Sequence, residues 1–390
     1  KRTNLMLIIS RSIKLFDLHF QLMNIIDIMK FHKSNKQKVI CFFFLLFFSG
    51  SIQGQEISSE GVKFCTWFQD KEGAISISFD DACYTQYEYA FPILEKYNLK
   101  ATFSLVGEWT HNTPTYSSEP NNFEVKKMGW NEIMELHQKG HEIAAHGFIH
   151  QKYDNLLPKE QIVRQMKDVK ELIESKILSQ TYTLHYPYSF TSEKIITAAK
   201  EAGFLFCRTG MDSINNANPK NMNYLDSKAI LNNNTPDSTQ LCKWISDAKG
   251  KWLILMYHHL FPENSKEMNI LNAHQVKNTY SLYPKTFESQ INLLVRSNYW
   301  IAPIVNIGKY VMERNNTKIQ ILKHRRKIVV TTNTEMDTSI YNQPLSIKIK
   351  TSWEKVVIKG SLNDGVFETT NNYLIITVLP RKSITILKKR

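Results

Sequence analysis

The sequence predicts an α/β barrel followed by a small all-β domain, and three observations support this class. Between about residues 73 and 310, short apolar runs alternate with segments whose apolar residues recur at helical spacing. This alternation is typical of a parallel sheet, and seven or so repeats favour closure into a barrel. After about residue 320 the helical spacing is lost and β-rich runs remain. We assign residues 55–318 to the barrel and residues 319–390 to the β-rich domain.

The barrel strands are predicted from short runs of aliphatic, β-branched and aromatic residues. They span residues 74–79, 101–106, 142–145, 183–186, 204–208, 252–257 and 300–303. The intervening helices carry apolar residues on one face, as at Ile162, Met166, Val169 and Ile173. They span residues 87–97, 130–139, 159–175, 192–201, 239–248 and 285–297.

The β-rich domain contains five predicted strands and no helical pattern. They span residues 327–332, 345–350, 354–359, 373–379 and 383–388. We favour a domain that stabilises or docks the barrel, with carbohydrate binding as the alternative.

The N-terminal segment, residues 1–54, is expected to be an extension followed by a signal peptide. Met29 precedes a basic stretch, and residues 39–48 form an apolar run of ten that ends in small and polar residues. Ten residues are too few to cross a bilayer as a helix. We expect export to the periplasm, the cell surface or the medium, with no integral span after signal removal. A single N-terminal membrane anchor is the alternative.

The overall charge does not indicate a nucleic-acid partner. The formal net charge is +13, but residues after 54 carry only 41 Lys and Arg against 34 Asp and Glu. No basic block with interleaved aromatic residues stands out in that part. The mild excess suits an anionic glycan surface, and solubility explains it equally well. Of the cysteines that would remain after export, Cys65, Cys83, Cys207 and Cys242, none is part of a CxxC pair, and we expect free buried thiols.

Polar side chains at strand ends suggest a metal site. Asp80 and Asp81 directly follow strand 74–79, and His146 and His150 follow strand 142–145. Adjacent carboxylates repel each other unless a cation lies between them or one is neutral. Together these residues offer three metal ligands and a spare carboxylate at the edge where barrel active sites lie. A solvated acidic turn and structural histidines are the simpler alternatives.

Three further strands end in groups that could face a ligand. Strand 252–257 delivers His258 to its exit, and Pro187 ends strand 183–186 because proline cannot continue a central strand. The backbone amide of Tyr188 would then point at a ligand. Arg208, at the end of strand 204–208, could do the same.

These motifs, taken in order, resemble those of a known family. They are Ser78-Phe79-Asp80-Asp81-Ala82, His146-Gly-Phe-Ile-His150, Tyr186-Pro187-Tyr188 and Leu255-Met-Tyr-His258. Their order and spacing are similar to those of the polysaccharide deacetylases, the NodB-like carbohydrate esterases of family four, over about residues 70–310. The resemblance implies a distorted (β/α) barrel of seven strands. It also implies one divalent metal, commonly Zn²⁺ with Co²⁺ or Ni²⁺ as alternatives, held by Asp81, His146 and His150.

The resemblance further implies roles for other residues. Asp80 would be the general base and His258 the general acid near the leaving amine, and the amide of Tyr188 would help to stabilise the oxyanion. From their positions at strand ends, we also expect Pro187 and Arg208 to lie at the substrate.

The chain departs from the family pattern at three places. Ala82 stands where the family usually has glycine, and His185 stands where an arginine steadies the base. The fourth family motif, an Asp-Trp pair, has no match around Asp212. Arginine and histidine are not equivalent, because histidine lacks a bidentate fork and is mostly neutral at pH 7. We hypothesise that Arg208 replaces the missing arginine in space.

The sequence therefore predicts a metal-dependent hydrolase that removes acetyl groups from an N-acetylated amino-sugar polysaccharide or oligosaccharide. An O-acetyl esterase of the xylan type would use the same site. The alternative to an active enzyme is a catalytically weakened glycan-binding protein that kept the barrel.

Overall fold

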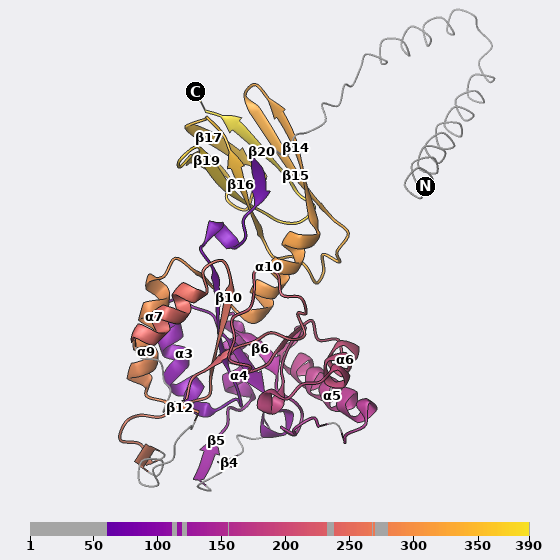
Figure 1. Ribbon diagram of the computed structural model, residues 1–390, viewed down its shortest axis with the longest axis vertical. Helices are drawn as coiled ribbons and strands as arrows, with labels where there is room; N and C mark the ends of the chain where they lie inside the picture. The colour runs from indigo at the N-terminus through magenta and orange to yellow at the C-terminus, as the bar shows by residue number, and fades with distance from the viewer. Residues whose placement is uncertain are drawn as a thin grey trace, which may run out of the picture. The chain divides into compact units, whose positions relative to one another are not determined.

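The computed structural model describes residues 61–110, 115–118, 123–154, 156–231, 238–266, 268–269 and 280–389. The predicted extension and signal peptide, residues 1–54, lie outside the described residues. The described part begins with a short strand and continues through an α/β region into a β-rich region (Figure 1).

The centre of the α/β region is a parallel sheet. Its strands follow the order β8-β7-β6-β3-β2-β10-β9, and β13 pairs with the first half of β2. They are β2 (Ala74–Phe79), β3 (Thr102–Leu105), β6 (Glu142–Ala145), β7 (Thr183–His185), β8 (Phe206–Arg208), β9 (Lys228–Ala229), β10 (Trp252–Tyr257) and β13 (Trp300–Ile301). All pairings in this sheet are parallel, so every strand presents its carboxyl end at one edge.

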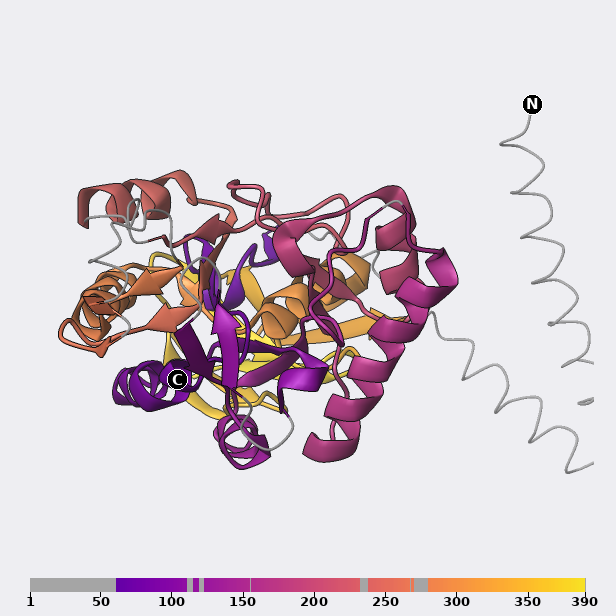
Figure 2. The same ribbon diagram turned by 90° about the horizontal axis from the view of Figure 1, so that it is seen from below.

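Helices surround the curved sheet (Figure 2). They are α3 (Phe91–Lys96), α4 (Trp130–Gln138), α5 (Lys159–Ile177), α6 (Glu193–Glu201), α7 (Ser238–Asp247), α9 (Pro284–Arg296) and α10 (Ile304–Asn316). The π-helix η2 (Gln86–Ala90) leads into α3, and the 3-10 turns η1 (Phe68–Asp70), η3 (Gly107–Thr110) and η4 (Pro187–Ser189) lie in connections. The buried face of α5 is formed by Ile162, Met166, Val169 and Ile173, as the sequence spacing predicts.

An irregular segment, residues 222–229, bridges the gap between β8 at one end of the sheet and β10 near the other. Its first part exchanges backbone hydrogen bonds with β8, where the Leu225 N–H donates to the Cys207 carbonyl at 2.8 Å. Its second part is β9, which pairs with β10 at the other end of the sheet. This segment closes the ring without a full strand, and the closure is therefore distorted. The predicted α/β barrel is confirmed.

Helix α10, which the sequence analysis missed, lies against the amino ends of the strands. Its first turn is held by barrel side chains: the Ile304 N–H donates to Thr102 Oγ1 at 3.0 Å, and the Val305 N–H to Glu142 Oε2 at 3.1 Å. A carboxylate at a helix N-terminus satisfies free N–H groups and complements the helix dipole. Ile304, Ile307 and Val311 are buried against the inner barrel face. These caps come from distant strands, so local sequence gave no start signal.

The β-rich region is a sandwich of two antiparallel sheets. One has the order β14-β15-β20-β17-β18 and the other β1-β16-β19. The strands are β14 (Thr317–His324), β15 (Lys327–Thr334), β16 (Leu345–Lys350), β17 (Lys355–Lys359), β18 (Gly365–Glu368), β19 (Tyr373–Val378) and β20 (Ser383–Lys388). Alternating residues such as Ile347, Ile376 and Ile386 form its buried core. The five predicted strands are present, joined by β14 and β18.

The sandwich also includes β1 (Val62–Phe64), which the sequence analysis placed with the barrel. It pairs antiparallel with β16, with Val62 opposite Ile349. A three-residue strand gives no sequence signal for its partner, which lies almost three hundred residues away. The chain therefore passes through the sandwich before entering the barrel, and the Tyr310 hydroxyl of α10 donates to the Cys65 carbonyl at 2.9 Å between them.

Two further strand pairs lie outside these sheets. Strands β4 (Thr115–Ser118) and β5 (Phe123–Lys126) form an antiparallel hairpin, and β11 (His259–Leu260) pairs in parallel with β12 (Ser281–Leu282). Among the described residues, no helix has the length and apolar character needed to cross a bilayer.

The packing of α10 on β8 predicts the effect of one substitution. An added Cβ at Gly308 would lie 2.4 Å from Cε1 of the buried Phe206 ring. Helix propensity alone favours alanine by about 1 kcal/mol, whereas overpacking a core costs roughly 1–3 kcal/mol. We expect Gly308→Ala to lower the free energy of unfolding, measured by urea denaturation. In a Phe206→Leu background the same change should be neutral or stabilising, and an equal loss in both backgrounds would refute this packing argument.

Candidate active site

The predicted site residues meet at the carboxyl edge of the barrel sheet. Asp80 and Asp81 follow β2, His146 and His150 follow β6, and His258 follows β10. The backbone turns sharply after β2, since Asp81 has φ 75° and Ala82 has φ 48°. This left-handed region costs a residue with a Cβ about 1–2 kcal/mol, which gives a physical reason for the glycine usually found in place of Ala82.

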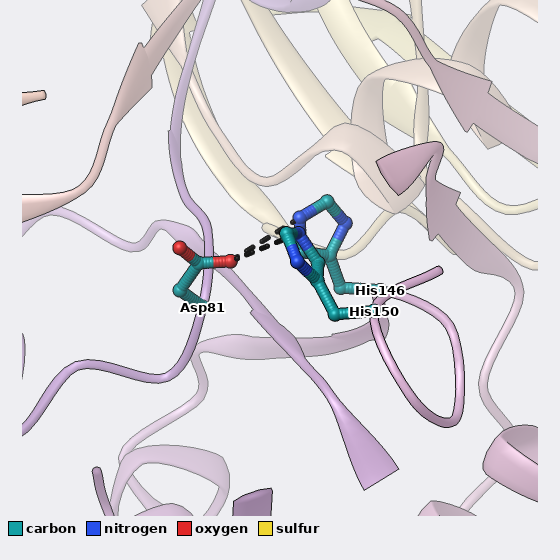
Figure 3. Close-up of side chains that lie close together, drawn as sticks. All are labelled: Asp81, His146 and His150. Carbon is teal, nitrogen blue, oxygen red and sulfur yellow. Dashed lines mark ion pairs between the residues drawn. The ribbon is translucent and has the colours of Figure 1, made fainter. Parts of the chain in front are cut away.

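Asp81, His146 and His150 form a cluster of potential metal ligands (Figure 3). One ligand atom from each lies within 4.8 Å of the others. Asp81 Oδ1 is 3.4 Å from His146 Nε2 and 3.5 Å from His150 Nε2. His146 is buried, whereas the side chains of Asp81 and His150 remain 16% and 13% exposed. The cluster is thus reachable from solvent on one side.

The surroundings of the cluster fit a divalent cation. Asp81 Oδ1 is buried and has no hydrogen-bond partner among the described residues. His146 Nδ1 lies 2.9 Å from the His185 carbonyl, to which it can donate, and this leaves Nε2 directed at Asp81. Metal-binding histidines are commonly oriented by such a contact at the other ring nitrogen. A carboxylate oxygen and two imidazole nitrogens are ligands that Zn²⁺ takes, with one position left open in catalytic sites.

The pKa values of the cluster follow from burial and from its mutual charges. Burial raises the pKa of Asp81, but the charge of Lys127 and the neighbouring histidines outweigh it and hold this pKa well below the usual range. Burial and the adjacent His146 lower the pKa of His150 to about 4. Burial also opposes the protonation of His146, yet the carboxylates of Asp80 and Asp81 raise its pKa. At neutral pH, Asp81 is therefore ionised and His150 neutral, as ligands must be.

Asp80 lies beside the cluster and is held by a different set of partners. Its Oδ1 accepts from Ser104 Oγ at 3.0 Å and lies 2.7 Å from His185 Nδ1, while its Oδ2 forms an ion pair with Arg208. Burial raises the pKa of Asp80, but Arg208 and the histidines outweigh this and hold it well below the usual range. Burial and the charge of Arg208 lower the pKa of His185 to about 3. His185 is therefore neutral and donates its Nδ1 hydrogen to the Asp80 carboxylate.

His258 faces Asp80 from the opposite strand. Its Nε2 is 3.8 Å from Asp80 Oδ2, and its ring packs on Tyr280 with 4.2 Å between centroids. Its Nδ1 is buried without a hydrogen-bond partner among the described residues. Burial lowers its pKa, although the carboxylates of Asp80 and Asp81 oppose this. His258 is thus a neutral imidazole close to an ionised carboxylate.

Tyr188 and Pro187 lie in the turn η4 after β7. The Tyr188 ring is 61% exposed and lies 4.7 Å from the His150 ring, between centroids. Its φ of 55° is again left-handed, a strain that is often found at functional sites. Pro187 is buried, close to Gly147 in the loop between the two histidines. The structure therefore brings Tyr188 to the candidate metal site.

The expected position of Arg208 at the substrate needs correction. Its side chain is only 1% exposed and forms the ion pair with Asp80 from behind the site. A buried guanidinium paired with a carboxylate cannot face solvent or a sugar. Arg208 instead occupies a place from which it steadies Asp80, in agreement with the hypothesis that it substitutes for the arginine missing at His185.

Other residues of the site carried no usable sequence signal. Ser104 and His185 contact Asp80, Tyr280 packs on His258, and Lys127 forms a β-bridge with Cys83, two residues after Asp81. His185 was noted only as a departure from a motif, although both its ring and its carbonyl hold site residues. The others follow no motif, and only their contacts identify them.

A cavity of about 380 Å³ lies elsewhere, at the amino ends of the strands. Its lining includes Glu142, Tyr182 and Lys309. The Glu142 carboxylate already accepts from Thr102, Thr183 and the first turn of α10. The cluster of potential metal ligands is at the opposite edge, where we place the candidate site.

Comparison with known proteins agrees with the motifs. A family model described as polysaccharide deacetylase matches residues 69–207. YxkH of Bacillus subtilis (strain 168), which carries the name of a polysaccharide deacetylase, is 29% identical over 139 residues. This alignment covers 35% of this chain and 45% of YxkH, so the chain matches less than half the length of that relative.

Two solved structures illustrate the likeness in three dimensions. Deacetylase PplD of Streptococcus pyogenes in complex with acetate is 21% identical, with a TM-score of 0.37 over 43% of this chain and 68% of that one. A family 4 acetyl xylan esterase from Clostridium thermocellum in complex with a cobalt ion is 17% identical, with a TM-score of 0.41 over 60% of this chain and 89% of that one.

The family match covers Asp80, Asp81, His146 and His150, which are the residues of the ligand cluster and its spare carboxylate. It also covers Pro187 and Tyr188, and it ends at Cys207, next to Arg208. The resemblance inferred from the motifs is confirmed. Residues 69–207 of the chain match the family model of the polysaccharide deacetylases, and they are similar in sequence to YxkH.

Proposed function

We propose that this chain is a metal-dependent hydrolase that removes acetyl groups from an N-acetylated amino-sugar polysaccharide or oligosaccharide. The observation that carries the proposal is the cluster of Asp81, His146 and His150 beside the ionised Asp80 and the neutral His258. The export signal expected in residues 1–54 adds a location outside the cytoplasm to this proposal, where such polymers are accessible.

Asp81, His146 and His150 would hold the metal, for which we propose Zn²⁺. A metal bound there would polarise the acetyl carbonyl and would lower the pKa of a bound water to about 7. The fit of the site rests on Asp81 Oδ1, which has no hydrogen-bond partner among the described residues, and on the His185 carbonyl that orients the His146 ring. The remaining chemistry belongs to the residues of the chain.

Asp80 is proposed to take the proton of the attacking water. Its carboxylate is ionised, and Arg208 and His185 fix its orientation from behind. A positioned base of this kind typically contributes 10²–10⁴-fold to a rate. Because the pKa of Asp80 is low, the carboxylate keeps an acquired proton only weakly.

His258 is proposed to carry that proton to the leaving nitrogen. Its Nε2 lies 3.8 Å from Asp80 Oδ2, and a neutral imidazole can accept a proton there before donating it. The water oxygen forms the new bond to the acetyl carbon as the carbon–nitrogen bond breaks. Acetic acid and a free amine result, and the acid then releases its proton to solvent as acetate. The amide of Tyr188 is proposed to face the oxyanion.

Acetate release tests the proposed reaction. We expect the protein to release acetate from N-acetylated chitooligosaccharides, to lose this activity with a chelator, and to regain it with Zn²⁺. The same assay on acetyl-xylan separates the N-acetyl from the O-acetyl substrate. Zn²⁺ binding without release from either substrate would favour the glycan-binding alternative over an enzyme.

Substitution of the two adjacent aspartates separates their roles. Asp80→Asn should reduce acetate release by roughly 10²–10⁴-fold, because it removes the base but no ligand. Its Zn²⁺ content, measured by atomic absorption, should match that of the unaltered protein. Asp81→Asn should lower both Zn²⁺ content and activity. Full activity in Asp80→Asn would remove this residue from the mechanism.

The charge of Arg208 predicts a change in pH dependence. It lowers the pKa values of Asp80, His185 and His258, so its removal should raise all three. Since Asp80 must be ionised and His258 neutral, the acidic limb of kcat/KM should move to higher pH in Arg208→Met, by about one unit or more. Arg208→Lys should move it less, and Lys228→Met, which removes a cation paired with Asp212, should leave it unchanged. An unmoved limb in Arg208→Met would contradict this account.

A further inference from the structure

A buried lysine lies against the turn that follows the ligand Asp81. Lys127 follows the β4–β5 hairpin and is 1% exposed. It forms an isolated antiparallel bridge with Cys83, and the next residue, Met128, donates its N–H to the Ala82 carbonyl at 2.7 Å. These contacts attach Lys127 to the turn that directly follows Asp81.

The side chain of Lys127 contacts Cys83 and Trp109. Its Nζ is 3.6 Å from Cys83 Sγ and 4.1 Å from the centroid of the Trp109 ring. The Trp109 ring is in turn 4.8 Å from the His150 ring. His259 also contacts Cys83, with 3.8 Å between its Nε2 and the cysteine Sγ. An aromatic face attracts a cation, and the Trp109 ring thus lies in contact with both the Lys127 side chain and the ring of the ligand His150.

The charge of Lys127 acts on those ligands. After burial, which raises the pKa of Asp81, the charge of Lys127 is the largest influence and lowers it. The same charge adds to the lowering of the pKa of His150 and of His259, for both of which burial is the main cause. A positive charge that favours an ionised Asp81 must also repel any further cation at the same place. Inside a protein such repulsion is only partly screened by solvent.

We propose that Lys127 tunes the candidate metal site electrostatically: its buried ammonium weakens the binding of a divalent cation by Asp81, His146 and His150. In return it keeps the local potential positive where the acetyl oxygen of the substrate gains negative charge. The first part concerns metal affinity, and the second rests on the proposed function. Preorganised positive charge at such a position stabilises the transition state without reorganisation.

A purely structural role for Lys127 makes a different prediction. If the lysine only fills space between Cys83 and Trp109, its replacement would loosen the turn at Asp81 and weaken metal binding. Electrostatic tuning predicts the opposite sign, tighter binding in spite of lost contacts. The direction of the change in affinity therefore separates the two roles.

The test measures Zn²⁺ affinity by competition with a chromophoric chelator. We expect Lys127→Met and Lys127→Gln to bind Zn²⁺ about tenfold more tightly than the unaltered protein, and Lys127→Arg to stay within about twofold, because it keeps the charge. Lys126→Met is the matched control: Lys126 is the neighbouring, exposed lysine, whose Nζ lies over the Tyr84 ring at 3.4 Å. Its affinity should not change.

The outcomes are distinguishable. Unchanged or weaker Zn²⁺ binding in folded Lys127→Met and Lys127→Gln, checked by circular dichroism, would overturn the inference. Equal tightening in Lys126→Met would overturn it as well, because a general effect of net charge would then explain it. Failure of the unaltered protein to bind Zn²⁺ would instead refute the proposed metal-dependent function. At saturating Zn²⁺, a lower kcat in Lys127→Met would support the second part of the inference, and an unchanged kcat would limit Lys127 to metal affinity.

Discussion

The buried ion pair between Asp80 and Arg208 is the interaction on which the rest of the site depends. Asp80 ends β2 and Arg208 ends β8, while His185 and Ser104 reach the same carboxylate from β7 and β3. One carboxylate thus ties together the ends of four strands. An isolated buried charge would be costly, but here each oxygen has a charged or hydrogen-bonding partner. The contact network also turns the His185 carbonyl toward His146, and so links the base to the ligand cluster.

Environment gives the two adjacent aspartates different properties. Asp80 is surrounded by hydrogen-bond donors and a guanidinium. Asp81, by contrast, has a left-handed backbone conformation, and its Oδ1, which has no hydrogen-bond partner among the described residues, faces two histidines. The same residue type, one position apart, is thereby suited to a base in one case and to a ligand in the other. Lys127 adds a third contribution, because this buried lysine is attached to the turn after Asp81 and its charge lowers the pKa of that aspartate. The electrostatics of the site extend beyond the residues that touch a metal or a substrate.

Much of the fold was predictable because it repeats local patterns. Strands such as Ala74–Phe79 and Trp252–Tyr257 carry apolar runs that end at polar residues, and helices such as α5 carry apolar residues at helical spacing. Helix α10 escaped prediction because its caps, Thr102 and Glu142, are supplied by strands far away in the sequence. Strand β1 was assigned to the wrong side of the domain boundary for the same reason, since its partner β16 lies in the distant sandwich.

The sequence alone determined most of the order of strands and helices, the resemblance to a family, and the residue types at the strand ends, because each is written in a contiguous segment. It also named Asp81, His146 and His150 as possible ligands through their motifs. Only the tertiary structure decided how these groups interact. It buried Arg208 against Asp80 instead of exposing it to substrate, and it brought His185 into contact with both Asp80 and His146. It also attached Lys127 to the turn that follows Asp81. Such pairings join residues from separate strands, and their energies depend on burial and distance, which no linear motif records.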